Sequence, residues 1–221
     1  MSFDPNIEQA RFNMIEQQIR PWDVLDPSVL SLLTIVRRED FVPSAYKALA
    51  FVDTEVPLPG GQFMLEPRVE ARLLQELAVH KHERALEVGA GSGFMAALLA
   101  HRAQHVTTLE ILPELARMAS ANLKRAAVMN ASVRQADGSR GLPAEGPFDV
   151  ILLSGSVAEV PQVLLAQLKV GGRLAAIVGQ QPVMCATLVT RSSEHGFASV
   201  ELFDTVAPRL QGFGEPPRFH F

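Results

Sequence analysis

The stretch ALEVGAGSGFMAALLA, residues 85 to 100, joins an apolar strand, a glycine-rich turn and the start of a helix. This order opens doubly wound α/β folds, and its turn lies where such folds bind ligands. In the dinucleotide fingerprint GxGxxG the third glycine would stand at Phe94, but here it comes one residue earlier, in GAGSG at 89–93. The stretch therefore predicts an α/β domain that binds a nucleotide or nucleoside, and by itself it leaves the ligand open.

Strands and helices alternate on both sides of this stretch, which predicts a mostly parallel, doubly wound sheet with right-handed crossovers. We expect strands at 84–88, 105–110, 131–135, 148–153 and 173–178, with helices at 95–103, 113–128 and 161–169. Two further strands, 183–191 and 197–204, have no helix between them and are expected to form an antiparallel pair at the sheet edge. The sheet would thus have seven strands.

The N-terminal third is expected to be a helical cap without strand alternation. Apolar residues at helical spacing predict a helix over 7–19, and Asp26 followed by Pro27 predicts the capped start of a helix over 26–36. A loop rich in Gly and Pro, 56–67, leads into a third helix near Pro67. The last ten residues, GFGEPPRFHF, are expected to be irregular because Gly and Pro interrupt them.

Length and composition limit the function classes. The 221 residues suit a single domain, and a net charge of −4 argues against a nucleic-acid groove, which needs a basic face. No apolar run reaches the roughly 18 residues of a membrane span. The first ten residues, MSFDPNIEQA, lack the basic and apolar regions of a secretory signal, so secretion is not expected. The single cysteine, Cys185, fits a reducing cytoplasm. The histidines form no metal-ligand pattern, so no metal is expected. A monomer or weak dimer is the expected state.

Acidic residues follow three successive strands. Glu87 precedes the glycine turn, Glu110 ends the second strand about 20 residues after Gly89, and Asp137 follows the third strand. Glu110 suits ribose hydroxyls, and Asp137 with Gly138 suits an adenine ring. Glu87 would repel a pyrophosphate by about 4 kcal/mol at 4 Å and would attract a sulfonium or ammonium group. A nicotinamide-dependent oxidoreductase is therefore the less favoured alternative.

This constellation resembles the class I methyltransferases that use S-adenosylmethionine, with a Rossmann-like fold. A narrower resemblance rests on NMIEQQI at 13–19, REDFVP at 38–43, GGQ at 60–62 followed by Pro67, the opening stretch, and QLKVGGRL at 167–174. Together these segments are similar to the protein-L-isoaspartate O-methyltransferase family. The resemblance implies transfer of a methyl group to the carboxylate of isoaspartyl residues in damaged proteins, with S-adenosylhomocysteine as the product.

The same resemblance divides the chain and implies its site residues. It implies a helical cap with an active-site loop at 1–66, an S-adenosylmethionine-binding core at 67–207 and a tail at 208–221. The catalytic positions it implies are Gln62, Phe63 and Leu65, and the cofactor-binding positions are Glu87, Gly89, Ala90, Gly91, Ser92, Gly93, Glu110, Ile111, Asp137, Gly138 and Ser154.

Three segments depart from the family pattern. Leu65 stands where the family has its active-site serine, and Phe63 stands where it has a threonine. The family tends to have a threonine followed by small apolar residues where this chain has Ser154-Gly155-Ser156. Ile177 stands where a proline is common. Two alternatives stay open at this point. The chain is an isoaspartyl methyltransferase, or it is an S-adenosylmethionine-binding homologue with a different acceptor or without isoaspartyl activity.

Overall fold

The computed structural model describes residues 5–214. The strands are β1 (Val56–Pro57), β2 (Phe63–Met64), β3 (Arg84–Val88), β4 (His105–Glu110), β5 (Ala131–Gln135), β6 (Phe148–Val157), β7 (Leu168–Gln180), β8 (Val183–Arg191) and β9 (Phe197–Asp204). The α-helices are α1 (Pro5–Met14), α2 (Pro27–Ile35), α3 (Pro67–Leu77), α4 (Phe94–Arg102), α5 (Pro113–Arg125) and α6 (Gln162–Leu165). Shorter helical turns are η1 (Ile15–Ile19), η2 (Arg20–Trp22), η3 (Arg38–Asp40), η4 (Ser44–Leu49), η5 (Pro59–Gly61) and η6 (Gly138–Arg140).

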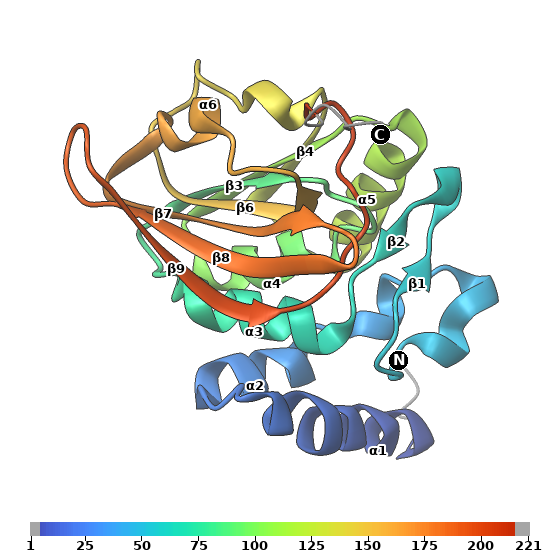
Figure 1. Cartoon of the computed structure of the whole chain (residues 1–221). Coiled ribbons are helices and arrows are strands. Elements are labelled where there is room, and N and C mark those ends of the chain that lie inside the picture. The colour runs from blue at the N-terminus through green and yellow to red at the C-terminus, as the bar shows by residue number, and fades with distance from the viewer. Residues whose placement is uncertain (1–4, 215–221) are drawn as a thin grey trace, which may run out of the picture.

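The central sheet has seven strands in the order β5-β4-β3-β6-β7-β8-β9 (Figure 1). The strands from β5 to β7 are parallel, and β8 and β9 add antiparallel neighbours at one edge. The seven-stranded, mostly parallel sheet with an antiparallel C-terminal pair is therefore confirmed. The chain leaves β3 toward β4 and β5 and returns to β6 on the other side of β3. The carboxyl ends of β3 and β6 consequently flank the topological switch point, where such sheets bind ligands.

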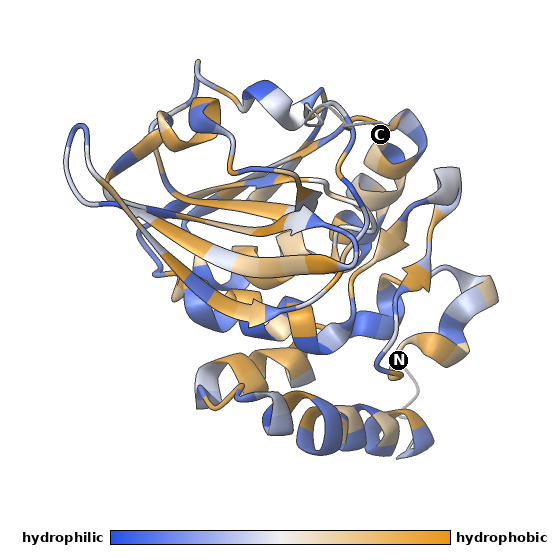
Figure 2. Ribbon diagram, in the orientation of Figure 1, coloured by the Kyte–Doolittle hydropathy of each residue, from blue (hydrophilic) through white to orange (hydrophobic). Residues whose placement is uncertain are grey.

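Helices cover both faces of this sheet. Residues of α3, α4 and α5 share the larger apolar cluster with one face of the strands, and α6 joins the smaller cluster on the other face. Along β3 the faces alternate: Ala85 belongs to the larger cluster, and Leu86 and Val88 belong to the smaller one. Glu87 therefore points toward α3 and α4, into the layer between the sheet and these helices. Figure 2 shows the apolar strands between helices whose outer sides are polar.

The strand β6 is longer than the sequence indicates and contains an irregularity. Its pairing with β7 shifts register between Leu152 and Ser156, so Ser154 lies inside the irregular stretch. Such irregularities redirect side chains and are common beside functional sites. The shift lets the Ser154 hydroxyl donate to Glu87 across the switch point at 2.7 Å.

Two expectations about local structure are wrong in detail. The helix expected over 161–169 is only α6, because the backbone of Gln167 already accepts from Phe148 at 2.8 Å and Leu168 pairs with that same residue in the sheet. The N-terminal third also contains strand structure. The residues of β1 and β2 pair antiparallel, Val56 with Met64, and close the loop before α3 into a hairpin.

The N-terminal helices agree with the prediction. Helix α1 continues into the π-helical turn η1, so that residues 5–19 are helical. Asp26 caps α2 by accepting from the backbone of Ser28 at 2.8 Å. No helix among residues 5–214 is long and apolar enough to cross a membrane.

The chain after β9 returns to the switch point (Figure 1). Ser156 donates its backbone N–H to Pro208 at 2.8 Å and accepts from the N–H of Leu210 at 2.9 Å. The part of the predicted tail that the structure describes, residues 208–214, is thus tied to β6. Residues 215–221 of that tail lie outside the described residues.

Candidate functional site

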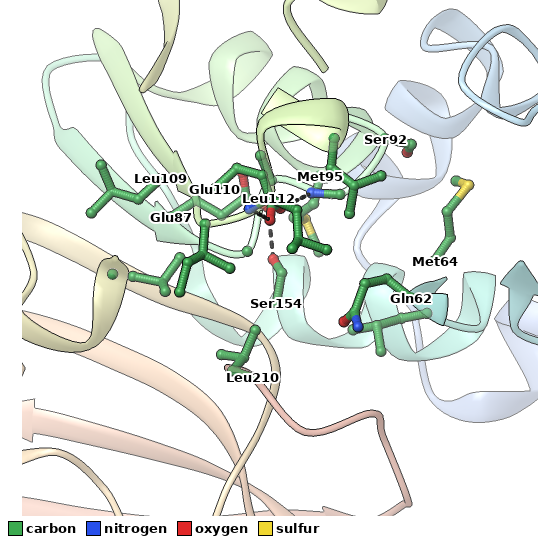
Figure 3. A pocket seen from close by; sticks show the side chains of 18 of the residues that line it. Gln62, Met64, Glu87, Ser92, Met95, Leu109, Glu110, Leu112, Ser154 and Leu210 are labelled. Atoms are coloured by element: carbon green, nitrogen blue, oxygen red, sulfur yellow. Dashed lines mark hydrogen bonds between the residues drawn. The ribbon is translucent and has the colours of Figure 1, made fainter. Parts of the chain in front are cut away.

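A pocket opens at the carboxyl ends of β3, β4 and β6. The empty space at this point is about 700 Å³ when the open solvent at its mouth is included. It is lined by Gln62, Phe63, Met64, Leu65, Glu70, Glu87, Val88, Gly89, Ala90, Gly91, Ser92, Phe94, Met95, Leu109, Glu110, Ile111, Leu112, Leu115, Gly138, Ser154, Leu210 and Gln211. Figure 3 shows Ser154, Glu87 and Glu110 together in this pocket, with Gln62 and Met64 on another side.

Glu87 is the most unusual of these side chains, because it is fully buried. Its Oε1 accepts from the Ser154 hydroxyl at 2.7 Å, whereas its Oε2 is buried without a hydrogen-bond partner among the described residues. Burial raises the pKa of Glu87 to about 7, and the nearby carboxylates of Glu70 and Glu110 act in the same direction. The hydroxyl groups of Ser154 and of Thr108, on the neighbouring strand β4, oppose that rise. Glu87 therefore has an unused acceptor atom and an excess of negative surroundings.

Glu110 lies at the end of β4 and is fixed by the glycine turn. Its Oε2 accepts from the backbone N–H of Gly91 at 2.9 Å, and its Oε1 accepts from the N–H of Leu112 at 3.0 Å. Each carboxylate oxygen has more than one lone pair. The carboxylate is thus held in one orientation and can still accept from two neighbouring hydroxyl groups.

These residues fit S-adenosylmethionine, the cofactor that the sequence resemblance implies. The unpaired Oε2 of Glu87 suits a cationic group, and the oriented carboxylate of Glu110 suits the ribose hydroxyls. At Gly138 a Cβ atom would come within 2.3 Å of a methyl group of Val88, so only glycine lets the backbone lie this close to the pocket floor. A pyrophosphate would instead meet buried carboxylates with no basic side chain among the lining residues.

The three implied catalytic positions all line the pocket. Leu65 is 5% exposed and Phe63 is 41% exposed, so the first is part of the wall and the second stands at the mouth. The β1–β2 hairpin accounts for the positions of Leu65 and Phe63, because its short pairing places residues 62–65 at the pocket. The side chain of Leu65 offers neither a donor nor an acceptor, whereas Gln62 contributes an amide to the pocket lining.

Two implied cofactor positions lie outside the lining residues. Gly93 has a φ of +84°, and a Cβ atom on it would come within 3.2 Å of the backbone of Ala119, so glycine allows α4 and α5 to pack closely. The exposed Asp137 caps η6 by accepting from the N–H of Ser139 at 2.9 Å. Contact of Asp137 with an adenine ring stays a prediction.

The sequence reasoning missed several residues of this pocket, of which Glu70 and Leu210 are the most informative. Glu70 is 5% exposed, and a signal for it exists: it stands four residues before Leu74 and seven before Leu77, on the buried face of α3. Leu210 lies against Gly89 and Gly155, so closely that a Cβ on either glycine would come within 3 Å of it. Nothing in the local sequence around Leu210 predicts this contact, because it depends on the path of the chain after β9.

Comparison with known proteins adds independent evidence. The sequence profile of the family described as protein-L-isoaspartate(D-aspartate) O-methyltransferase matches residues 9–204. A protein-L-isoaspartate O-methyltransferase of Methanoculleus marisnigri is 39% identical over 196 residues, which cover 89% of this chain and 88% of the relative. One from Rhodopseudomonas palustris is 39% identical over 192 residues, with coverages of 86% and 88%.

A solved structure agrees at the level of the fold. It is a Plasmodium falciparum protein described as a protein-L-isoaspartate O-methyltransferase, crystallised in complex with S-adenosyl-L-homocysteine. It superposes with a TM-score of 0.79 and is 21% identical, and the match covers 94% of this chain and 99% of that protein.

Proposed function

Because the chain belongs to the protein-L-isoaspartate(D-aspartate) O-methyltransferase family, we propose that it transfers the methyl group of S-adenosylmethionine to the carboxylate of isoaspartyl residues in damaged proteins. As a member of this family the chain is an S-adenosylmethionine-dependent O-methyltransferase. The observation that carries the proposal is the buried Oε2 of Glu87, which lacks a partner in a pocket rich in carboxylates.

S-adenosylmethionine supplies an electrophilic methyl group on a positively charged sulfur. Glu87 and Ser154 orient one negative charge toward the positive end of this molecule, and Glu110 accepts from its ribose. The hairpin residues Gln62, Phe63 and Leu65 form the wall that separates this side from the acceptor. The apolar side chains Met64, Leu65 and Met95 exclude water from the region between them.

The acceptor side needs little chemistry from the protein. A carboxylate is ionised at pH 7 and is already a nucleophile, so no general base is required. Alignment with the methyl group supplies the main effect, and orientation can contribute about 7 to 11 kcal/mol. A serine in place of Leu65 would add one hydrogen bond to a charged group, about 1.5 to 3 kcal/mol, or about 10- to 150-fold in rate. Its absence slows this reaction without abolishing it.

A different acceptor is the second candidate, and one observation favours it. Leu65 is buried and makes the wall apolar where the sequence resemblance implies a hydroxyl group, while Phe63 presents an aromatic ring at the mouth. Such a wall suits an acceptor with an apolar group beside the methylated oxygen. This alternative keeps the S-adenosylmethionine site unchanged.

Two measurements test the proposal. Calorimetry with S-adenosylhomocysteine and with NAD tests the site: tight binding of the first and none of the second is expected. Transfer of a labelled methyl group to an isoaspartyl peptide, with the matched aspartyl peptide as control, tests the acceptor. Equal labelling of the two peptides, or none of either, would reject isoaspartyl specificity and favour the alternative acceptor.

A further inference from the structure

A buried ion pair lies directly behind the acceptor wall. Arg38, in η3, is 1% exposed and donates through one terminal nitrogen to the carboxylate of Glu70 on α3. Through its other terminal nitrogen it donates to the backbone carbonyl of Leu65 at 2.7 Å. One guanidinium group thus joins η3 to α3 and to the link that precedes α3, which lie 32 and 27 residues later in the chain.

The surroundings hold this guanidinium in one place. Its central carbon lies 5.1 Å from the centroid of the Phe94 ring, within the range of cation–π contacts. Phe94, Leu65 and Glu70 all line the pocket, whereas Arg38 does not. Arg38 therefore supports the wall from behind through its contacts with these three lining residues.

We propose that Glu70 and Arg38 are positioning residues for methyl transfer, because the Glu70 carboxylate orients Arg38 and Arg38 fixes the backbone of Leu65 at the acceptor wall. The inference rests on the proposed function in taking residues 62–65 as that wall. A planar guanidinium has several donors in a fixed arrangement, so it can bridge a carboxylate and a carbonyl at the same time. A lysine cannot reproduce both contacts.

Burying the charges of Arg38 and Glu70 costs desolvation free energy, which argues for a role of this ion pair beyond folding. Breaking a buried ion pair is destabilising, but replacing both partners with apolar residues is often neutral or stabilising. Burial raises the pKa of Glu70 to about 7 against the lowering effect of Arg38. The charged groups that face Glu70 are Arg38 from η3 and Glu87 from β3.

The chain provides a matched control pair away from the pocket. Arg173 donates to both oxygens of Glu83, at 2.7 and 2.9 Å, and also to the backbone carbonyls of Leu77 and Ala78. Like Arg38, it bridges a carboxylate and backbone carbonyls, and neither Arg173 nor Glu83 lines the pocket. Arg173→Lys should therefore cost stability without affecting the acceptor wall.

The test compares Arg38→Lys and the double variant Arg38→Met/Glu70→Leu with Arg173→Lys. We expect both pocket variants to lose about tenfold or more in kcat for an isoaspartyl peptide while the Kd for S-adenosylhomocysteine changes less than about threefold, since misalignment alone is costly. Glu70→Gln keeps an oxygen that accepts from Arg38 and should retain most of the activity at pH 8. Arg173→Lys should keep kcat and KM while its Tm falls.

Hydrogen exchange at residues 62–66 separates this inference from the proposed function. Faster exchange of this segment in Arg38→Lys, and not in Arg173→Lys, supports the positioning role whatever the acceptor is. If the wild-type chain fails to methylate the peptide, the proposed function is wrong, and hydrogen exchange at residues 62–66 still tests the positioning role of Arg38. Unchanged exchange at 62–66, or a folded double variant with wild-type kcat, would overturn the positioning role.

Discussion

Glu87 should make ligand binding depend on pH, and this dependence tests the electrostatic reading of the pocket. Burial raises the pKa of its carboxyl to about 7 in the ligand-free protein, so the group is partly protonated at neutral pH. A cationic ligand favours the ionised form and must displace that proton. Binding of S-adenosylhomocysteine, which carries an α-ammonium group, is therefore expected to tighten as the pH rises through 7.

The size of the effect follows from this pKa. With a pKa of about 7, roughly a tenth of Glu87 is ionised at pH 6 and roughly nine tenths at pH 8. The Kd should accordingly fall about tenfold between these two values. Glu87→Gln should remove the dependence and weaken binding at pH 8 by about 10- to 150-fold, the value of about 1.5 to 3 kcal/mol for a hydrogen bond to a charged group.

Calorimetry in buffers with different ionisation enthalpies measures both the Kd and the proton release. About half a proton should leave per ligand bound at pH 7. Glu114→Gln, which removes an exposed carboxylate outside the pocket, is the charge-matched control and should behave as the wild type. A Kd that stays constant from pH 6 to 8, or a Glu87→Gln variant that binds normally, would refute the reasoning.

Three further predictions concern the same residues. Ser154→Ala removes the hydroxyl that stabilises ionised Glu87, so the pKa of Glu87 should rise further and the Kd for S-adenosylhomocysteine at pH 7 should increase, measured by the same calorimetry. Leu65→Ser should raise the rate of methyl transfer to an isoaspartyl peptide by about 10- to 150-fold; an unchanged rate in a radiolabel assay would contradict the assignment of this position. Glu70 and Glu87 both have pKa values raised above those of the unfolded chain, so the folded state favours their protonated forms. The free energy of unfolding should therefore increase as the pH falls from about 8 to about 5, and urea titrations of Glu70→Gln should show a smaller increase. The carboxyls with lowered pKa, Asp26, Glu83 and Asp149, lose their stabilising effect only at lower pH.

The fold could be predicted from the sequence because the patterns that specify it are local and repeated. Glycines at 89–93 and alternating strands and helices specify the parallel sheet. The acids at the carboxyl ends of its strands then lie at the same edge of the sheet. Glu87 and Glu110 could be predicted from this arrangement alone. The end of α6 could not, because the pairing of Leu168 with Phe148 in the sheet overrides the helical pattern of 161–169.

The remaining parts of the site depend on long-range contacts. Leu210 packs against Gly89 although the two residues are more than a hundred positions apart in the chain. Ser154 is placed beside Glu87 by a register shift in β6 that the local sequence does not predict. The role of Arg38 is of the same kind. Its motif, REDFVP, contributes to the family resemblance, but the bridge to Leu65 and Glu70 exists only in the folded chain.

The charge balance of the pocket reconciles three buried acids with an anionic acceptor. Arg38 neutralises Glu70, and two backbone N–H groups orient and stabilise Glu110. Among the described residues, Glu87 is the one acid of the three with a fully buried oxygen that has no hydrogen-bond partner. A cationic ligand in the pocket would compensate its charge. We therefore expect an acceptor carboxylate to meet more repulsion before S-adenosylmethionine binds than afterwards, so that the cofactor binds first.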